Sequence, residues 1–221
     1  MITSNALYPN NNLLRRYGCG VNILKAQSRL LILFAKNPRT EQVKTRLARD
    51  IGQENAVRVY TYLLKENIRI HSHAPYDFMV YTQGDPSYFS PLRTRPQNGS
   101  DLGEKMHGAF VQELHQYTRV VLIGSDLILS SDCIAHAFSS LEREDLVIGP
   151  ATDGGYYLIG MKEDLDIFSD IPWSSSTVFI DTIQKIKGFG KSIAMLSELR
   201  DIDTGEDIPY YPEVLPLIHT P

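Results

Sequence analysis

RVVLIGSD, residues 119–126, is the stretch of the sequence that decides the fold. Its apolar run from 120 to 123 is typical of a strand buried on both faces of a parallel sheet. The run ends at Gly124, and Asp126 follows almost directly. This carboxylate has two interpretations: it belongs to a turn or a helix cap, or it is a ligand for a divalent metal beside an anionic substrate.

Strand-like and helix-like segments alternate along the rest of the chain. Solid apolar runs predict strands within residues 29–36, 76–83, 145–161 (two strands split by a turn) and 192–204 (a last strand and the segment that leaves it). Apolar residues at helical spacing predict helices within 54–66, 103–117, 131–142 (with Ser131 available as its cap) and 175–190. This alternation predicts an α/β fold of three layers, α/β/α, with a mostly parallel sheet covered by helices on both faces.

The bulk composition limits the classes of function. The chain has 221 residues, 43% of them apolar, and a formal net charge of −4, which argues against a broad basic surface for nucleic acid. Two distant cysteines form no disulfide framework, and no apolar run approaches the roughly 20 residues of a membrane span. We expect a cytoplasmic protein with a polar extension (residues 1–28) and a single domain (residues 29–221). Its oligomeric state stays open.

A cationic loop follows the first predicted strand. Lys36, Arg39, Lys44 and Arg46 lie within eleven residues, and Glu41 is the only opposing charge. A loop that enters a helix offers both cations and free N–H groups, which phosphates require. The alternative is a solvated basic stretch that forms salt bridges elsewhere. The Gly-Lys-Ser/Thr signature of a P-loop is absent from the sequence.

The loop after the second predicted strand could contact a nucleotide base. The amide of Gln97 could read a base edge, and Gly99 would allow the backbone to come close. The alternative is a surface turn in which Ser100 or Asp101 caps the next helix.

Asp153 stands at the tip of the predicted turn that contains Gly154 and Gly155. An ordinary hairpin explains the same residues without any chemistry, because Asp-Gly is a common turn pair. Trp173 follows in a later loop, where it either lines a substrate pocket or anchors the loop in the core.

Asp203 follows the last predicted strand. Thr204 and Asp207, next to it, have the spacing of a capping box, so this segment also has a purely structural interpretation.

Asp126, Asp153 and Asp203 each follow the end of a predicted strand. We expect these three residues to meet at one edge of the sheet, opposite the cationic loop. In open α/β sheets ligands bind outside the carboxyl ends of the strands. Carboxylates gathered there would repel one another unless a cation lay among them. A hard divalent ion with oxygen ligands, Mg²⁺ or Mn²⁺, satisfies this requirement, and the cationic loop adds a site for a nucleotide diphosphate or triphosphate.

The motifs also resemble a known family, DUF2064, whose members are glycosyltransferase-like proteins with the GT-A (nucleotide-diphospho-sugar transferase) fold. Some members are described as arsenosugar-biosynthesis glycosyltransferases or as transferases associated with radical SAM proteins. The resemblance covers about residues 29–210. The motifs, in order, are KNPRTEQVKTRLA (36–48), DLGEKM (101–106), VLIGSD (121–126), GPATDGGYYLIG (149–160), IPWSS (171–175) and RDIDTGED (200–207).

The resemblance implies roles for individual residues. Asp126 corresponds to the metal-binding aspartate of GT-A proteins, and Asp203 resembles a second metal ligand of related nucleotidyltransferases. The cationic loop would hold the nucleotide phosphates, and the region of Gln97 and Gly99 would read the base. The sequence departs from the family at Glu41, where a glycine is usual, and after Asp126, where Ile128 replaces a proline.

The sequence therefore favours a metal-dependent transferase that uses a nucleotide-activated donor, with a glycosyltransferase as the leading hypothesis. Asp153 would orient the acceptor hydroxyl of a small molecule or act as its base. The first alternative is a nucleotidyltransferase, similar to a guanylyltransferase, that joins an NTP to a phosphorylated acceptor. The second is a catalytically degenerate nucleotide-binding protein, suggested by the two departures from the family.

Overall fold

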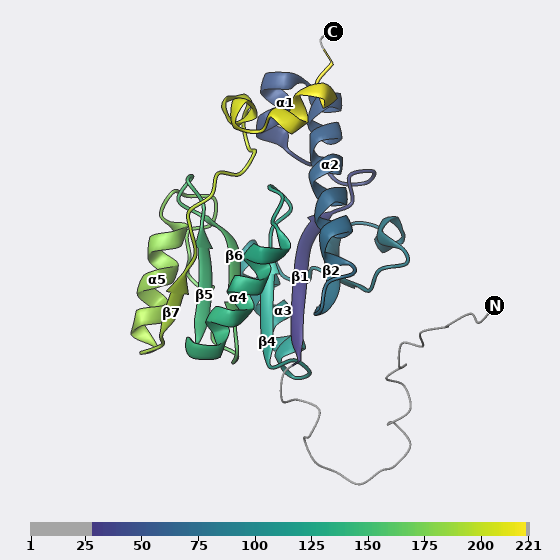
Figure 1. Ribbon diagram of the computed structural model, residues 1–221. Coiled ribbons are helices and arrows are strands. Elements are labelled where there is room, and N and C mark those ends of the chain that lie inside the picture. Colours follow the sequence, from purple (N-terminus) through teal and green to yellow (C-terminus); the bar gives the residue numbers. More distant parts are fainter. Residues whose placement is uncertain (1–27, 220–221) are drawn as a thin grey trace, which may run out of the picture.

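The computed structural model describes residues 28–219. The predicted extension, except for its last residue Ser28, lies outside the described residues, as do the last two residues of the chain. One seven-stranded sheet, in the order β3-β2-β1-β4-β6-β5-β7, forms the middle layer (Figure 1). The strands are β1 (Arg29–Lys36), β2 (Asp77–Gln83), β3 (Thr94–Pro96), β4 (Arg119–Ile123), β5 (Leu146–Pro150), β6 (Tyr156–Met161) and β7 (Ile193–Met195).

Helices cover both faces of this sheet, as the sequence predicts. Alternate residues of β1 take part in two separate cores: Leu31 and Leu33 pack with the cluster that includes α2 and α4, whereas Leu30 and Ile32 pack with α3 and α5. The helices are α1 (Thr45–Ile51), α2 (Gln53–His71), α3 (Leu102–Leu114), α4 (Ser131–Arg143) and α5 (Val178–Gly188). The described residues also form three 3₁₀ helices: η2 (Pro86–Phe89), η3 (Gly205–Tyr210) and η4 (Pro212–Leu217).

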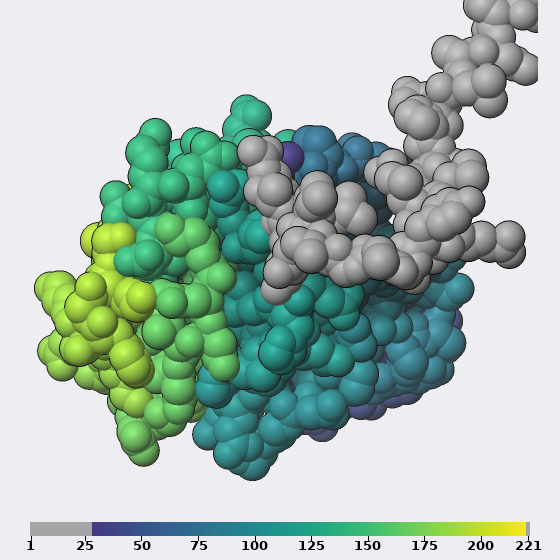
Figure 2. All heavy atoms as spheres, turned by 90° about the horizontal axis from the view of Figure 1, so that it is seen from below, coloured from purple at the N-terminus to yellow at the C-terminus, as the bar shows by residue number. Residues whose placement is uncertain are grey.

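The strand directions decide where the site lies. β1 is parallel to both β2 and β4, and β5 is parallel to β7. β6 runs antiparallel to its two neighbours, β4 and β5, so these two run in the same direction. The carboxyl ends of β1, β2, β4, β5 and β7 consequently lie at one edge of the sheet. Figure 2 shows the opposite end, where β1 begins and where residues from the middle of the chain, in teal and green, form most of the surface.

Several element boundaries differ from those that periodicity predicts. Ser130, and not Ser131, caps α4: its backbone is extended and its Oγ accepts a hydrogen bond from the amide of Cys133 at 3.2 Å, while Ser131 is already helical. α3 ends at Leu114, before Tyr117. The short helix α1 was not predicted, because its seven residues carry too few apolar positions to show a period.

No helix of the described residues is both long enough and apolar enough to cross a membrane.

His71, the last residue of α2, provides a prediction about stability. Its side chain is fully buried and its Nδ1 lies 2.8 Å from the hydroxyl of Tyr76. Burial lowers the pKa of His71 from 6.5 to about 4. Between these two pH values the unfolded chain binds a proton that the folded chain excludes, so the free energy of unfolding falls as the pH falls below 6.5. The expected loss from this group is about 2 kcal/mol between pH 7 and pH 5.

Urea denaturation at both pH values tests this prediction. His71→Gln should show a fall in stability that is smaller by about 2 kcal/mol than in the wild-type protein. His73→Gln is the matched control, because His73 lies two residues away and is exposed. Equal pH dependence in His71→Gln and the wild-type protein would contradict the prediction.

Candidate active site

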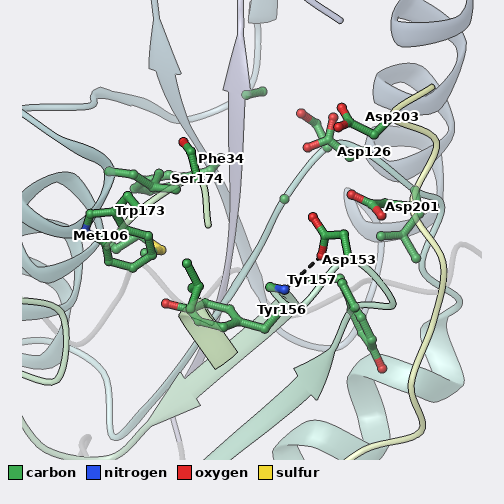
Figure 3. Close-up of a pocket in the computed structure, with 18 of the residues that line it drawn as sticks. Phe34, Met106, Asp126, Asp153, Tyr156, Tyr157, Trp173, Ser174, Asp201 and Asp203 are labelled. Atoms are coloured by element: carbon green, nitrogen blue, oxygen red, sulfur yellow. Dashed lines mark hydrogen bonds between the residues drawn. The ribbon is translucent and has the colours of Figure 1, made fainter. Parts of the chain in front are cut away.

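A cavity of about 740 Å³ lies at the carboxyl edge of the sheet. Its wall is formed by the ends of β1 and β4, the start of the antiparallel strand β6, the start of α1, the loop before α5 and the segment that follows β7 (Figure 3). This volume is within the range of sites for small molecules and cofactors. The predicted residues that line it are Lys36, Lys44, Arg46, Gln97, Asp126, Asp153, Gly155, Trp173 and Asp203.

Four aspartates gather on one side of the cavity: Asp126, Asp153, Asp201 and Asp203 (Figure 3). The loop after β4 carries Asp126, and the turn between β5 and β6 carries Asp153, whose Oδ1 accepts a hydrogen bond from the amide of Gly155 at 2.8 Å. Burial, together with the charges of Asp153 and Asp126, raises the pKa of Asp201 to about 6. Burial is the larger cause of this rise, and the two neighbouring carboxylates add to it because like charges disfavour ionisation of Asp201.

The segment after β7 presents its two aspartates because it is extended. Ile202 is fully buried, so its neighbours Asp201 and Asp203 both turn towards the cavity. The amide of Ile202 donates to the carbonyl oxygen of Asp126 at 3.1 Å, which ties this segment to the loop after β4. The predicted capping box of Thr204 and Asp207 is present and fixes the far end of the segment at the start of η3.

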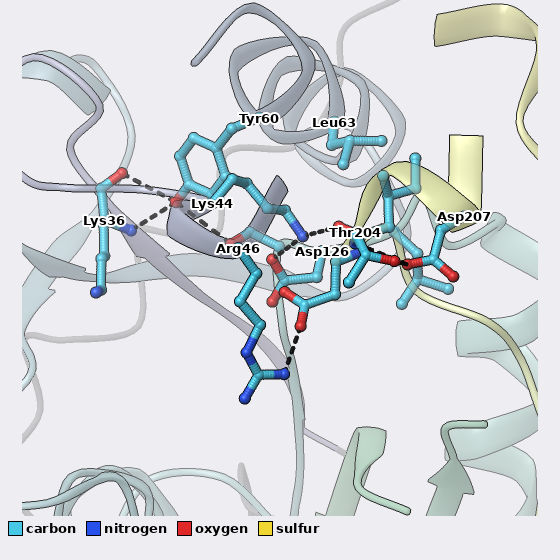
Figure 4. A network of polar contacts seen from close by, with 12 residues as sticks. Lys36, Lys44, Arg46, Tyr60, Leu63, Asp126, Thr204 and Asp207 are labelled. Atoms are coloured by element: carbon cyan, nitrogen blue, oxygen red, sulfur yellow. Dashed lines mark hydrogen bonds and ion pairs between the residues drawn. The ribbon is translucent and has the colours of Figure 1, made fainter. Parts of the chain in front are cut away.

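Lys44 and Arg46, both labelled in Figure 4, each form an ion pair with one of these carboxylates. The ammonium of Lys44 is 2.5 Å from Oδ1 of Asp126 and also donates to the carbonyl of Ile202. The guanidinium of Arg46 is 2.7 Å from Oδ2 of Asp203. The cationic loop therefore reaches the acidic side of the cavity. Two of the cations predicted to bind phosphate, Lys44 and Arg46, are paired with carboxylates of the chain in this structure.

Tyr60 of α2 joins the loops that follow β1 and β4. Its hydroxyl accepts a hydrogen bond from the amide of Lys36 at 2.7 Å and donates to the carbonyl of the same residue at 3.1 Å. The hydroxyl of Ser125, next to Asp126, lies 3.3 Å away. Burial raises the pKa of Tyr60 to about 12, so this phenol stays neutral and serves as a fixed hydrogen-bonding group.

The other side of the cavity is apolar and aromatic (Figure 3). Met106, Tyr156 and Trp173 lie there with Phe34 and Leu102. The rings of Tyr156 and Trp173 meet edge to face, with their centroids 6.5 Å apart. Trp173 thus serves both purposes weighed from the sequence, because it lines the cavity and also packs against the second core.

Three predicted residues lie outside the lining. The guanidinium of exposed Arg39 stacks on the ring of Tyr88 at 5.2 Å, and Gly99 and Gly154 form turns with positive φ. Gln97 lines the cavity, but its side-chain nitrogen donates to the carbonyls of Ala35 and Tyr81. Only its side-chain oxygen is left to contact a ligand.

The donor set can be compared with what a divalent ion requires. No three or more His, Cys, Asp or Glu side chains between residues 28 and 219 are placed to enclose a metal. Mg²⁺, however, is commonly bound by one or two carboxylates together with substrate phosphates and water. The carboxylates of Asp126 and Asp203, which both line the cavity, could supply one or two ligands of this kind.

The sequence interpretation did not select Asp201, Tyr60 or Tyr156 as site residues. For Asp201 the signal is present, since two aspartates flank a single apolar residue in an extended segment and therefore face the same way. Tyr60 and Tyr156 carry no such signal, because their positions within a helical stripe and an apolar strand are typical of core residues.

Solved structures of other proteins share this fold. A candidate nucleotide-diphospho-sugar transferase of Desulfovibrio desulfuricans G20 is 29% identical, with a TM-score of 0.78 over 85% of this chain and 88% of that chain. The 4-diphosphocytidyl-2C-methyl-D-erythritol synthase of Anaerococcus prevotii DSM 20548 is 10% identical, with a TM-score of 0.57 over 86% and 96%. Rv0371c of Mycobacterium tuberculosis H37Rv, solved in complex with manganese, is 11% identical, with a TM-score of 0.51 over 85% and 99%.

The fold is thus that of the nucleotide-diphospho-sugar transferases and nucleotidyltransferases, in agreement with the predicted GT-A class. The family model DUF2064, described as an uncharacterized protein conserved in bacteria, matches residues 72–175. This match confirms the resemblance to that family over the matched range, which includes Gln97, Asp126, Asp153 and Trp173. The motifs at residues 36–48 and 200–207 lie outside it. No curated protein matches the chain.

Proposed function

We propose that the chain is a metal-dependent transferase that uses a nucleotide-diphospho-sugar donor, and that its acceptor is an uncharged small molecule with a hydroxyl group. The observation that carries this proposal is the distribution of charge in one cavity. Cations and carboxylates alternate on one side of it, where a diphosphate and its ion would lie, and the other side is apolar. The likeness to the Desulfovibrio protein, at 29% identity, supports the same class of donor.

The inventory of cations favours glycosyl transfer over the nucleotidyl alternative. Among the described residues, the lysines and arginines that line the cavity are Lys36, Lys44 and Arg46, and all three lie between the last residue of β1 and the first turn of α1. A phosphorylated acceptor would need further cations on the opposite side of the cavity, where the lining is aromatic and aliphatic. A neutral acceptor needs none.

In this proposal some residues of the chain stabilise the departing diphosphate, and others bind and orient the acceptor. Bound Mg²⁺ or Mn²⁺, held by Asp126 and Asp203, would stabilise the negative charge of the departing diphosphate. Lys36 and the backbone of the cationic loop would bind the same diphosphate. The exposed carboxylate of Asp153 would accept a hydrogen bond from the acceptor hydroxyl and orient it, while Trp173 and Tyr156 exclude water from the reacting atoms.

A thermal-shift titration with nucleoside diphosphates and Mn²⁺ is the first test. A ligand at about 100 times its Kd stabilises the folded state by roughly 2.7 kcal/mol, which corresponds to about 5 to 10 °C for a chain of this size. We expect such a shift with at least one of UDP, GDP, ADP, CDP or TDP, and only in the presence of Mn²⁺. The absence of any shift over the whole panel would defeat the proposal.

The released product then separates the alternatives. A nucleotide sugar incubated with a panel of neutral hydroxyl acceptors should give a nucleoside diphosphate. Release of pyrophosphate from an NTP with phosphorylated acceptors would establish the nucleotidyltransferase instead. Binding without turnover over both panels would favour the degenerate nucleotide-binding protein that Glu41 and Ile128 suggest.

A further inference from the structure

Each carboxylate assigned to the divalent ion already has a cation of the chain in contact with it. Lys44 lies 2.5 Å from Asp126, and Arg46 lies 2.7 Å from Asp203. Both cations come from one short segment at the start of α1, and both acids come from loops at the carboxyl edge of the sheet. Both ion pairs therefore join the segment at the start of α1 to loops at this edge of the sheet. Figure 4 shows the contact of Lys44 with Asp126.

Lys44 is held more firmly than a phosphate-binding lysine on an open loop would be. Its side chain is 2% exposed, and its ammonium is shared between Asp126 and the carbonyl of Ile202. Its backbone has φ 49° and ψ 46°, the left-handed conformation that non-glycine residues rarely adopt. Surrounding contacts have to maintain such a conformation, and the ion pair and the hydrogen bond of the ammonium are among the contacts that Lys44 makes.

The oxygens of Asp126 and Asp203 cannot serve an ammonium or guanidinium and a divalent ion equally well. A second cation beside Asp126 would lie within a few ångströms of the Lys44 ammonium, and like charges at that distance repel each other. The ion pairs must loosen for a divalent ion to bind. Phosphate oxygens would offer Lys44 and Arg46 new anionic partners and so reduce the cost of loosening.

We propose that Lys44 and Arg46 compete with the divalent ion for Asp126 and Asp203, so that the ion binds tightly only together with the nucleotide diphosphate. This inference rests on the proposed function and adds an order to it: ion and nucleotide enter as a complex, and each increases the affinity for the other. Because such coupling is reciprocal, it is measurable from the metal side alone.

The test measures Mn²⁺ binding without any nucleotide, from the loss of the electron paramagnetic resonance signal of free Mn²⁺. The variants are Lys44→Met, Arg46→Met and Arg49→Met. Arg49 is the matched control, because it is an exposed cation of the same helix α1 and does not line the cavity. We expect Mn²⁺ alone to bind at least 10-fold more tightly to Lys44→Met than to the wild-type protein, severalfold more tightly to Arg46→Met, and within twofold for Arg49→Met.

A second measurement follows the coupling itself. Addition of the nucleoside diphosphate that binds best should strengthen Mn²⁺ binding by wild-type protein at least 10-fold, and should have a smaller effect in Lys44→Met. If Lys44→Met does not fold, as judged by circular dichroism, Arg46→Met carries the test, since the Arg46 side chain is 56% exposed. Affinity for Mn²⁺ alone that is no higher in Lys44→Met and Arg46→Met than in Arg49→Met would overturn the inference. The proposed function would survive that result if wild-type protein still bound nucleotide with Mn²⁺.

Discussion

The Asp126→Asn variant is expected to lose about 1000-fold in kcat/KM for transfer from a nucleotide sugar. Asn keeps the shape of the side chain and an oxygen that can accept from Lys44, but it removes the negative charge that would hold the ion against the departing diphosphate. Loss of a single electrostatic contact to the transition state typically costs 10²- to 10³-fold, and the ion acts on the largest charge that develops in this reaction.

Asp132→Asn is the matched control for Asp126→Asn. Asp132 is exposed in the first turn of α4, outside the cavity, so its neutralisation changes the net charge equally. Its expected effect on kcat/KM is less than twofold, with a loss of unfolding free energy of about 0.3 to 1 kcal/mol from the end of the helix. Steady-state kinetics at several Mn²⁺ concentrations provide the measurement. Near-normal turnover by Asp126→Asn at every concentration would remove Asp126 from the site.

The sheet was largely predictable because its strands are buried on both faces. β1 and β4 are continuous apolar runs, and such runs are hard to place anywhere except the middle of an α/β sheet. The three-residue edge strands β3 and β7 were not predicted with their bounds, since so few residues show no period. The antiparallel direction of β6 could not be predicted from the spacing of apolar residues. The same apolar run forms a strand whether a tight turn makes it antiparallel to its neighbour or a crossover makes it parallel.

The acidic side of the site followed from topology. Strand exits were expected to meet at one edge, and the cavity does contain Asp126, Asp153 and Asp203 in its lining. The pairing of charges could not be predicted in the same way. The contact of Lys44 with Asp126 joins residues from distant parts of the sequence, and Lys44 has a left-handed backbone for which the sequence carries no signal.

The turn that carries Asp153 depends on a glycine with no room for a side chain. Gly154 has φ +90°, and a Cβ added to it would lie 2.1 Å from the carbonyl oxygen of Ser176. The carbonyl of Gly154 also accepts a hydrogen bond from the amide of Phe179 at 2.8 Å. The turn between β5 and β6 is therefore packed directly against the loop that begins α5 and carries Trp173. This packing connects the acidic side of the cavity, at Asp153, with the aromatic side, at Trp173.

Gly154→Ala is accordingly expected to damage both stability and activity. The left-handed backbone costs an alanine about 1 kcal/mol, and overlap with a rigid backbone adds about 1 to 3 kcal/mol. Gly190→Ala separates the two contributions, because Gly190 has φ +67° and nothing within 4 Å of its added Cβ. Denaturant unfolding should show a loss of about 1 kcal/mol for Gly190→Ala and about 2 to 4 kcal/mol for Gly154→Ala.

Only Gly154→Ala should also reduce transfer activity in the fraction that remains folded, because the shifted loop would carry Trp173 away from the cavity and Asp153 away from the acceptor. Kinetics below the unfolding transition measure this effect. Equal losses of stability in the two variants would show that the loop before α5 yields readily to the added methyl group, and that the turn does not position the aspartate.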